Sequence, residues 1–439
     1  ARRASRLAAG SFGCSTPAAR SKLARILAGE GTFVTTGQQP LLFLGPLFTL
    51  YKALTAVEAA RRLEGRREDM GPALALFWIA SDDHDWDEIG RTALLDPGNE
   101  LRTLTLAPPP GHAARPAGPT PLPEEIGALV DQLSDLLPES EFRDVHIALI
   151  RDAYRAGRPL GQAFAAALAG ILDGVDFVWL DAAEPAMKRA SAGLFRELLT
   201  RADEAQRAAE TGAARVAGAG HEPPIPLLDG ALPLMVDTGE ARVRLYRDDA
   251  GIRAGRDGAP ERLERWLERL DGDPGRFSPN VASRPLLEAW LLPVEASTLG
   301  PGELAYWSQL PPLFEAFDVP FPAVAARAAW TIVEPKIGRT LERLGATPEE
   351  MEDGGAAVIE RLTREGRPAA VESALGELRA GLGRGFGALE SAVAAELPGV
   401  RSAVGKARKL AFDAVATLVG TMDAQVRERS HTQVRQVHK

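Results

Sequence analysis

The sequence predicts an α/β protein with a parallel β-sheet core and a helical C-terminal region. An apolar segment, GTFVTTG at residues 31–37, ends in a glycine turn, and apolar residues at helical spacing follow from Pro46. A second unbroken apolar run, ALALFWIAS, occupies residues 73–81. Strand, helix and strand in this order are typical of the βαβ unit of a parallel sheet. Beyond residue 348, long stretches rich in alanine, glutamate, arginine and leucine predict only helices.

Later segments add strands to the predicted sheet from distant parts of the chain. FVWLDA at residues 177–182 predicts a third strand, and a helix is expected over 187–199. LLPVEAST (291–298) and PFPAVAA (320–326) predict two further strands, separated by a helix over 303–317. The sheet is therefore expected to be assembled from separate pieces.

Two insertions are predicted between these pieces. The first spans about 107–160 and begins with a proline-rich loop. The second spans about 212–275, where the alternation in LPLMVDTGEARVRLYRD predicts a small antiparallel hairpin. We therefore expect a core domain over residues 1–335 and a helical domain over 336–439. Breaks at 366–368 and near Pro398 would divide the latter into helices that fold back as an antiparallel coiled coil.

Composition excludes several classes of protein. The 439 residues are 45% hydrophobic and 25% charged, which is typical of a globular chain large enough for two or three domains. The net charge of -9 argues against a nucleic-acid-coating protein, and the basic end at 427–439 is interleaved with polar residues as on a solvated helix. No apolar run is long enough to span a membrane.

The only cysteine is Cys14, so an internal disulfide and a cysteine-based zinc cluster are excluded. This usage favours a reducing compartment, and we expect a cytoplasmic protein. The opening segment lacks the continuous apolar stretch of a signal peptide and is expected to be part of the fold. Cys14 has no histidine near it in sequence, which argues against a nucleophilic role.

The first group of candidate site residues follows the first predicted strand. Gly37 would let a ligand approach the backbone, and Gln38 and Gln39 offer donors and acceptors. Gly45 and Lys52 follow in the next turn and helix. Because ligands of doubly wound sheets bind beyond the carboxyl ends of strands, this segment is a candidate rim. A polar turn that caps the strand is the alternative.

The second group follows the next strand, where Trp78 precedes the cluster Asp82, Asp83, His84 and Asp85. A histidine between aspartates is expected to have a raised pKa and to act as a general acid or base. The same cluster could hold a divalent cation. A solvated turn that caps the next helix is the alternative.

The third group lies in a glycine-rich turn and the helix that it opens. Gly302 and Glu303 stand in the first turn, where a carboxylate is stabilised by the helix dipole and could receive an ammonium group. Tyr306 and Gln309 are expected on the same side of that helix. Upstream polar residues approach the same segment, namely Ser278, Asn280 and Arg284. Capping and aromatic packing form the alternative.

Together these segments resemble the bacillithiol biosynthesis cysteine-adding family. The resemblance rests on TTGQQPLLFLGPLFTLYKALTA, FWIASDDHDWDEI, the segment from SPNVASRPLLEAW through STLGPGELAYWSQL to FDVPFP, and Arg327, in this order. It implies a Rossmann-like core with inserted connecting segments, a C-terminal coiled coil and a homodimer. It also implies a ligase that joins the carboxylate of cysteine to the amine of glucosaminyl-malate.

The implied chemistry needs an activated carboxylate, so we expect ATP as the activating cofactor. The core resembles that of class I aminoacyl-tRNA synthetases, but HIGH and KMSKS are absent, as is a phosphate-binding GxxxxGK[ST] loop. A requirement for a metal is left open. The expected partners are small-molecule substrates and a second copy of the chain, with neither nucleic acid nor membrane.

We hypothesise that His84, with Asp83 or Asp85, deprotonates the attacking amine. Malate carries two carboxylates, for which bidentate arginine pairing is best suited. The candidate cations for this task are Arg284, Arg327 and Lys52. Two alternatives remain: a metal-dependent hydrolase with Asp82 to Asp85 as ligands, and a non-catalytic nucleotide-binding or coiled-coil scaffold protein.

Overall fold

The computed structural model describes residues 5–66, 71–112, 114–352 and 354–429. The chain divides into two compact units, residues 1–329 and residues 330–439. The last ten residues of the basic segment 427–439 lie outside the described residues.

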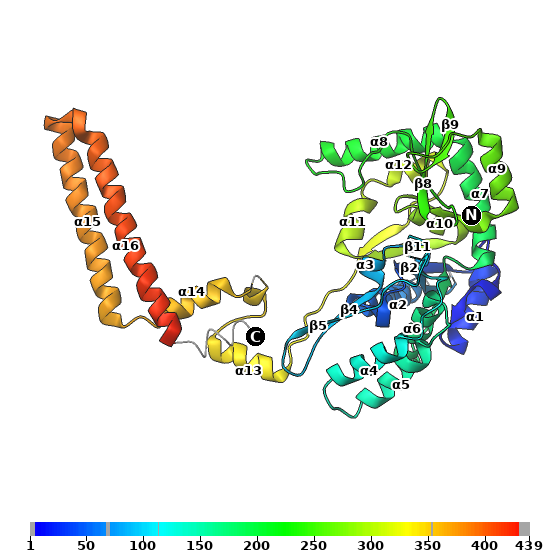
Figure 1. The fold of residues 1–439 in the computed structure, drawn as a ribbon, viewed down its shortest axis with the longest axis horizontal. Helices are drawn as coiled ribbons and strands as arrows, with labels where there is room; N and C mark the ends of the chain where they lie inside the picture. The colour runs from blue at the N-terminus through cyan, green and yellow to red at the C-terminus, as the bar shows by residue number, and fades with distance from the viewer. Residues whose placement is uncertain (1–4, 67–70, 113, 353, 430–439) are drawn as a thin grey trace. The chain divides into compact units, whose positions relative to one another are not determined.

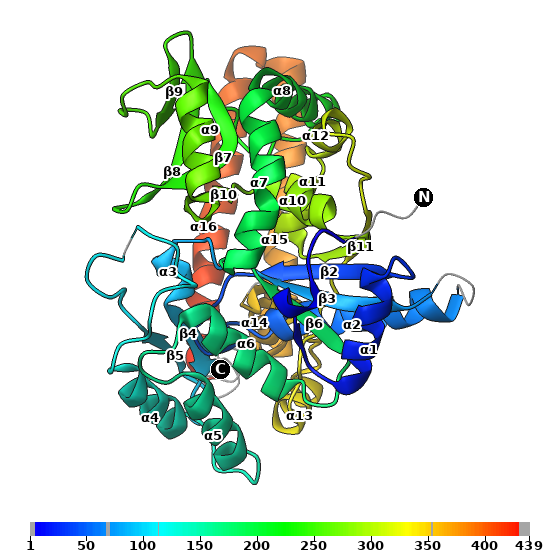
Figure 2. The same cartoon turned by 90° about the vertical axis from the view of Figure 1, so that its right-hand side faces the viewer.

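A six-stranded sheet forms the centre of the first unit, in the order β1-β6-β3-β2-β11-β12. Figure 1 labels β2 and β11 of this sheet, and Figure 2 also labels β3 and β6. All neighbours are parallel except β1, which pairs antiparallel with β6 at one edge. The strands are β1 (Gly13–Cys14), β2 (Thr32–Gln38), β3 (Ala73–Ile79), β6 (Phe177–Asp181), β11 (Val294–Leu299) and β12 (Ala323–Ala326). The predicted parallel sheet and its distant pieces are thus confirmed, whereas the edge strand β1 was not predicted.

Both faces of this sheet are buried, which explains the unbroken apolar run of β3. Alternate residues point to opposite faces: Leu76 and Trp78 belong to one hydrophobic cluster, and Phe77 and Ile79 to the other. Helices cover the first face, chiefly α1 (Pro17–Leu27), α7 (Pro185–Thr200) and α10 (Ser283–Leu291). The second face is covered by α2 (Phe48–Arg66) and α6 (Leu160–Ile171).

The order of strands places a topological switch point between β2 and β11. From β2 the chain passes through α2 to β3 on one side, while β11 pairs with β2 on its other side. Helices that leave the two strands diverge at such a point, which opens a crevice at the carboxyl ends. The segment after Gln38 and the segment after Leu299 flank this crevice.

The second predicted insertion builds a separate four-stranded antiparallel sheet in the order β10-β7-β8-β9. Figure 2 shows β7, β8 and β9 together with α9, apart from the strands of the core sheet. The elements are β7 (Ala231–Asp237), β8 (Arg242–Asp248), β9 (Gly251–Ala254) and β10 (Phe277–Pro279), with α8 (Ala202–Gly218) and α9 (Leu263–Gly272). The hairpin prediction is confirmed for β7 and β8, and the sheet is larger than predicted.

The first predicted insertion follows a two-stranded hairpin and consists of helices. The hairpin joins β4 (Arg91–Leu95) to β5 (Leu101–Thr105) after the short helix α3 (Trp86–Ile89). Helices α4 (Ile126–Leu136) and α5 (Arg143–Ala153) follow.

The helix predicted over 303–317 is in fact two helices. These are α11 (Pro301–Trp307) and α12 (Pro311–Ala316). A proline provides no backbone N–H for the preceding turn, so Pro311 and Pro312 fit the start of a new helix and cannot continue the old one.

The second unit consists of helices, in the part of it that the structure describes. They are α13 (Pro335–Leu344), α14 (Ala356–Glu365), α15 (Ala369–Glu396) and α16 (Arg401–Arg429). The breaks predicted at 366–368 and near Pro398 are confirmed, and α15 and α16 lie side by side as a hairpin (Figure 1). Arg367, at the start of this hairpin, donates two hydrogen bonds to the carboxylate of Asp423, at 2.7 and 2.9 Å. Among the described helices, none is both long and apolar enough to cross a bilayer.

Candidate functional site

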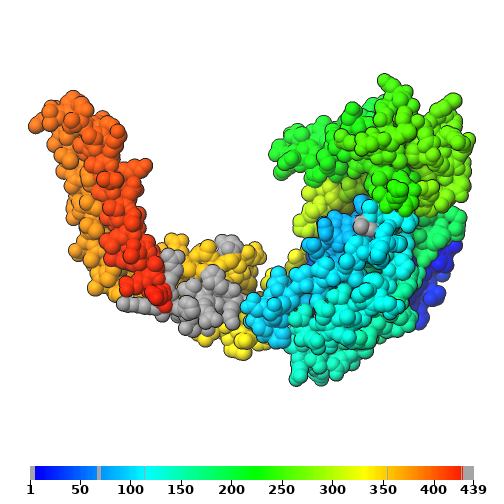
Figure 3. All heavy atoms as spheres, viewed as in Figure 1, coloured from blue at the N-terminus to red at the C-terminus, as the bar shows by residue number. Residues whose placement is uncertain are grey.

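A cavity of about 480 Å³ lies beyond the carboxyl ends of β2 and β3, between the core sheet and the inserted sheet. We call it the main cavity. In the space-filling view the residues of the first unit up to about 150, blue to cyan, and those of the inserted sheet, green, form adjoining parts of the surface (Figure 3). The main cavity is lined by Gly37, Gln38, Gln39, Lys52, Trp78, Ala80, Asp82, Asp83, His84, Ala182, Met235, Arg242, Arg244, Pro279, Asn280, Val281, Arg284, Glu303 and Tyr306.

Lys52 is the most tightly held cation of the main cavity. Its Nζ pairs with Glu303 Oε2 at 2.7 Å and donates to Gly37 O and Gln38 Oε1 at 2.8 and 2.9 Å. Only 7% of the side chain is exposed. Burial lowers the pKa of Lys52, and Glu303 opposes this effect. The lysine therefore joins α2 to the ends of β2 and α11.

Glu303 also fixes the turn that opens α11. Its Oε2 accepts a hydrogen bond from Gly300 N at 2.8 Å, as in a capping box. Arg284 lies next to this turn and pairs with the buried Glu288 at 3.0 Å. A Cβ at Gly37 would stand 3.0 Å from Trp78 O and 3.7 Å from an Arg284 nitrogen. Glycine at this position therefore permits the close approach of strand and arginine.

The paired glutamines form a hydrogen-bonded link across the cavity wall. Gln38 accepts from Lys52, and its Nε2 donates to Gln39 Oε1 at 3.2 Å. Gln39 Nε2 donates in turn to Asp83 Oδ2 at 2.9 Å and to Glu88 at 2.8 Å. Both glutamines thus orient charged protein groups, and the link connects Lys52 with Asp83.

The four consecutive polar residues of the second group have four different environments. Asp82 is buried and forms an ion pair with Lys188 of α7. Asp83 Oδ1 accepts from the backbone of His84 at 2.7 Å. Asp85 caps α3, as the alternative interpretation proposed, and accepts from the amides at 87 and 88. Of these four residues, Asp82, Asp83 and His84 line the main cavity and Asp85 does not.

The prediction of a raised pKa for His84 is wrong. Burial and the positive charge of Arg242 lower the pKa of His84, and they outweigh Asp83 and Asp85, which raise it. The sequence showed the neighbouring aspartates but not the arginine, which is 158 positions away. His84 is therefore neutral at pH 7.

Arg242 also determines which imidazole nitrogen carries the proton. Its Nη1 lies 3.4 Å from His84 Nδ1. A guanidinium can only donate, so Nδ1 is the acceptor and the proton of neutral His84 resides on Nε2. Arg242 is itself held by Ser278 Oγ at 2.9 Å and Pro279 O at 2.6 Å. In this arrangement Nε2 of His84 is a hydrogen-bond donor, and the imidazole is a poor base.

The metal-hydrolase alternative lacks a set of ligands. Across residues 5–429, apart from those not described, no three His, Cys, Asp or Glu side chains converge as they would to hold a metal ion. Asp82 is turned toward Lys188 and Asp85 toward the start of α3. The acidic cluster in the sequence is therefore not a cluster in space.

Four predicted binding residues do not line the main cavity. Gly45 has φ 65° and ends a 3₁₀ turn, where a Cβ would clash with Leu41. Gly302 lies in the first turn of α11. Arg327 stacks on Phe48 and donates to a backbone carbonyl, near Lys52.

Gln309 is the fourth of these residues. It follows the end of α11, so it does not share the side of that helix with Glu303 as predicted. The Oε1 of its buried amide accepts a hydrogen bond from Ile225 N at 2.6 Å, and the Nε2 donates one to Ile225 O at 3.1 Å. Gln309 thus anchors the loop before β7.

Sequence reasoning missed the cavity residues of the inserted sheet and the partner of Asp82. Arg242 and Arg244 are two positions apart on β8 and therefore share a face. The alternating pattern that predicted the hairpin contained this information, but it did not indicate which face meets the core. Lys188 lies on a helix whose contact with Asp82 depends on tertiary structure.

The fold and site define a class: an α/β protein with a Rossmann-like sheet and a polar ligand cavity at its topological switch point. The chain belongs to the family described as "Bacillithiol biosynthesis BshC, N-terminal Rossmann-like domain", whose model matches residues 7–328. The family resemblance of the sequence motifs is thereby confirmed.

Several relatives carry the name "Putative cysteine ligase BshC". The protein of Symbiobacterium thermophilum is 29% identical over 94% of this chain and 76% of its own length. Those of Salinibacter ruber and Koribacter versatilis are 29% and 30% identical over 76% and 80% of this chain. The chain spans 60% and 64% of the length of these two relatives.

Proposed function

We propose that this chain is a ligase that forms an amide between the carboxylate of L-cysteine and the amine of glucosaminyl-malate, within bacillithiol biosynthesis. Family membership and the names of the relatives support the ligase class. The observation that carries the proposal is the main cavity, where Lys52, His84 and Asp83 are held in fixed positions beyond the switch point.

The reaction requires activation of a carboxylate before an amine can attack it. We propose that ATP provides this activation: a cysteine carboxylate oxygen attacks a phosphorus of ATP and displaces diphosphate or ADP. The amine nitrogen then bonds to the acyl carbon, and the carbon–oxygen bond to the nucleotide or phosphate breaks. One proton leaves the amine.

The geometry changes the roles that we assign to the polar residues. His84, neutral and protonated on Nε2, would donate a hydrogen bond to the oxygen that gains charge at the acyl carbon. Asp83, a carboxylate exposed to the cavity, would accept the proton of the amine. Gln39 would position Asp83 through its 2.9 Å hydrogen bond.

We further propose that the hairpin of α15 and α16 is an antiparallel coiled coil that forms a homodimer with a second copy. Large apolar side chains remain exposed along both helices, namely Leu378, Leu389, Leu410 and Leu418. Light scattering on the purified protein tests this association. A monomer at all concentrations would contradict it. We also propose a cytoplasmic location, which fits a reduced thiol substrate and ATP.

Mass spectrometry tests the function directly. Purified protein is incubated with cysteine, ATP and glucosaminyl-malate, beside a His84→Ala variant of the same preparation. We expect the mass of the cysteinyl amide with the wild type and far less of it with the variant. Binding of the substrates without any product would favour a non-catalytic protein.

A further inference from the structure

Arg244 stands at the junction of two cavities. Besides the main cavity, a second cavity of about 180 Å³ lies between α8, β7 and the loop before β7; we call it the side cavity. Its wall is formed by Ala205, Gln206, Ala209, Glu210, Ile225, Pro226, Leu227, Leu228, Asp229, Ala231, Leu232, Pro233, Arg244, Asn280, Ala282, Gln309, Leu310 and Leu313. Two polar residues, Arg244 and Asn280, line both cavities.

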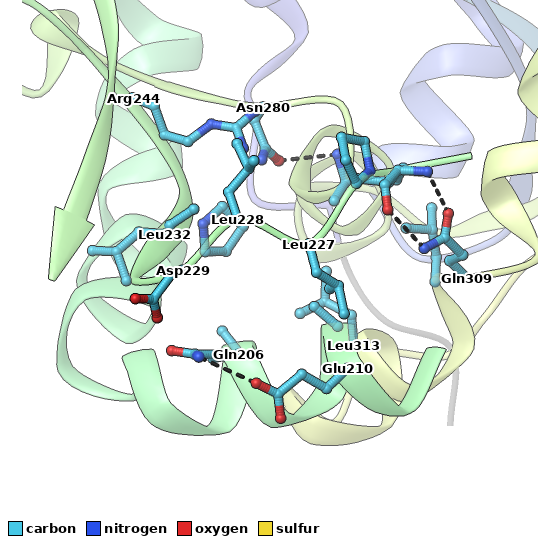
Figure 4. Close-up of a pocket in the computed structure, with 18 residues that line it drawn as sticks. Gln206, Glu210, Leu227, Leu228, Asp229, Leu232, Arg244, Asn280, Gln309 and Leu313 are labelled. Atoms are coloured by element: carbon cyan, nitrogen blue, oxygen red, sulfur yellow. Dashed lines mark hydrogen bonds between the residues drawn. The ribbon is translucent and has the colours of Figure 1, made fainter. Parts of the chain in front are cut away.

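Figure 4 shows how these two residues lie. Arg244 reaches from β8 toward Asn280 at one edge of the side cavity, while Gln206, Glu210 and Asp229 lie at the opposite edge. Leucine side chains form much of the wall between them. A cavity of on the order of 150 Å³ can hold a molecule the size of benzene, so the side cavity has room for a small ring.

Arg244 differs from the other cations of the main cavity because its side chain has no partner among the described residues. Lys52 pairs with Glu303 and Arg284 with Glu288. Arg242 is bound by Ser278 and Pro279. Within the described residues, the guanidinium of Arg244 has neither an ion pair nor a hydrogen bond.

The neighbours of Arg244 also favour an anion at this position. Burial is the largest cause that lowers the pKa of Arg242, and Asp82 and Asp83 oppose it; Arg244 lies close enough to lower this pKa as well, by a smaller effect. Two like charges in a partly enclosed space repel each other, and an anion between them relieves this repulsion. Asn280 uses its Oδ1 as acceptor from the amides at 282 and 283. Its Nδ2 has no partner among the described residues and remains a donor.

We propose that Arg244, with Asn280, is the anion anchor of the site and binds a carboxylate or phosphate group of a ligand that lies across the junction of the main and side cavities. Guanidinium and amide donors together match the oxygens of either group. This inference rests on the proposed function for the choice of ligands: glucosaminyl-malate presents carboxylates and ATP presents phosphates.

Direct binding measurements test the anchor independently of catalysis. Glucosaminyl-malate and ATP are titrated separately, by calorimetry, into the wild type, Arg244→Gln and a matched control, Arg247→Gln. Arg247 lies on the same strand but pairs with Asp203 at the surface. Loss of a charge-assisted hydrogen bond should weaken binding roughly ten- to a hundred-fold in Arg244→Gln, whereas the control should bind as the wild type does.

The ligand that loses affinity identifies the bound group. Weaker binding of glucosaminyl-malate assigns a carboxylate to Arg244, and weaker binding of ATP assigns a phosphate. If Arg244→Gln does not fold, Arg244→Lys replaces it, because lysine keeps the charge and loses the bidentate geometry; it should bind more weakly than the wild type.

Two results would overturn the anchor: a variant that binds both ligands within two-fold of the wild type, or a wild type that binds neither. The proposed ligase activity fails separately. Normal binding without formation of the amide would leave the anchor in place and remove the function. Amide formation by the wild type, together with unaltered ligand binding by Arg244→Gln, would support the function and remove the anchor.

Discussion

The main cavity receives cations from two regions of the molecule, and the two sets are neutralised differently. Lys52 and Arg284, which come from helices of the core, each pair with a buried or half-buried carboxylate. Arg242, which comes from the inserted β8, is bound by uncharged oxygens of Ser278 and Pro279. Arg244, on the same strand, has no partner for its guanidinium among the described residues. The core cations therefore fix the shape of the cavity, and the inserted sheet gives it positive charge for an anionic ligand.

Removal of a core cation should have the largest effect on stability. Lys52→Met leaves Glu303 and the carbonyl of Gly37 without their partner, and breaking one side of a buried pair costs about 3–5 kcal/mol. The control is Lys22→Met, which breaks a pair with Glu64 whose side chains are 31% and 35% exposed. Such a pair contributes about 0–1 kcal/mol. Urea denaturation compares the variants, and equal losses would contradict the structural role of Lys52.

The next largest effect concerns the proposed donor, His84. His84→Ala should lower kcat about a hundred-fold, since removal of one donor to a developing charge has this magnitude. His84→Gln retains an N–H donor and should recover part of the loss. Steady-state kinetics separates the role of hydrogen-bond donor from that of general base, because glutamine would not restore the activity of a base. An unchanged kcat in His84→Ala would eliminate both roles.

A smaller effect should distinguish Gln309 from the residues of the main cavity. Gln309→Met keeps the volume but leaves the backbone N–H and C=O of Ile225 unpaired, at a cost of about 1–3 kcal/mol. The free energy of unfolding should fall, and KM for each substrate should change less than it does in Arg244→Gln. A raised KM with unchanged stability would restore the original assignment of Gln309 to substrate binding.

The smallest predicted effect is on the titration of His84. Burial and Arg242 hold the pKa of His84 below its usual 6.5, so the neutral form persists to lower pH. If the neutral form is the active one, kcat stays constant above pH 6.5 and falls only below it. Arg242→Gln removes one of the two causes and should raise this pKa, as followed by NMR, with Arg247→Gln as control. An unchanged pKa would show that Arg242 does not set the state of the imidazole.

The sequence predicted those parts of the fold that depend on local pattern. The apolar run of β3 and the breaks at 366–368 follow from burial on both faces and from backbone chemistry, and both can be read over a few residues. The edge strand β1 has two residues, too few for a pattern. The division of the helix over 303–317 was missed although Pro311 and Pro312 indicated it.

The predicted residues that line the main cavity lie near the end of a strand or in the turn or helix that follows it. Gln38 ends β2, Gln39 follows it, and Asp83 lies in the turn after β3, so the parallel sheet brings them together. Arg242 reaches His84 from an insertion 158 positions away, and no local rule gives that distance. The error in the pKa of His84 followed from its burial and from this missing residue, neither of which the local sequence shows. Adjacent aspartates in sequence were read as a cluster, whereas Asp82 turns to Lys188.

The most direct test of the proposed ligase follows oxygen from cysteine. The chain is incubated with glucosaminyl-malate, ATP and cysteine that carries ¹⁸O in both carboxylate positions, and the products are analysed by mass spectrometry. Activation at the carboxylate predicts an amide that retains one ¹⁸O, with the other in AMP or inorganic phosphate. Absence of the amide, or an amide with no label in either phosphorus product, would contradict the account.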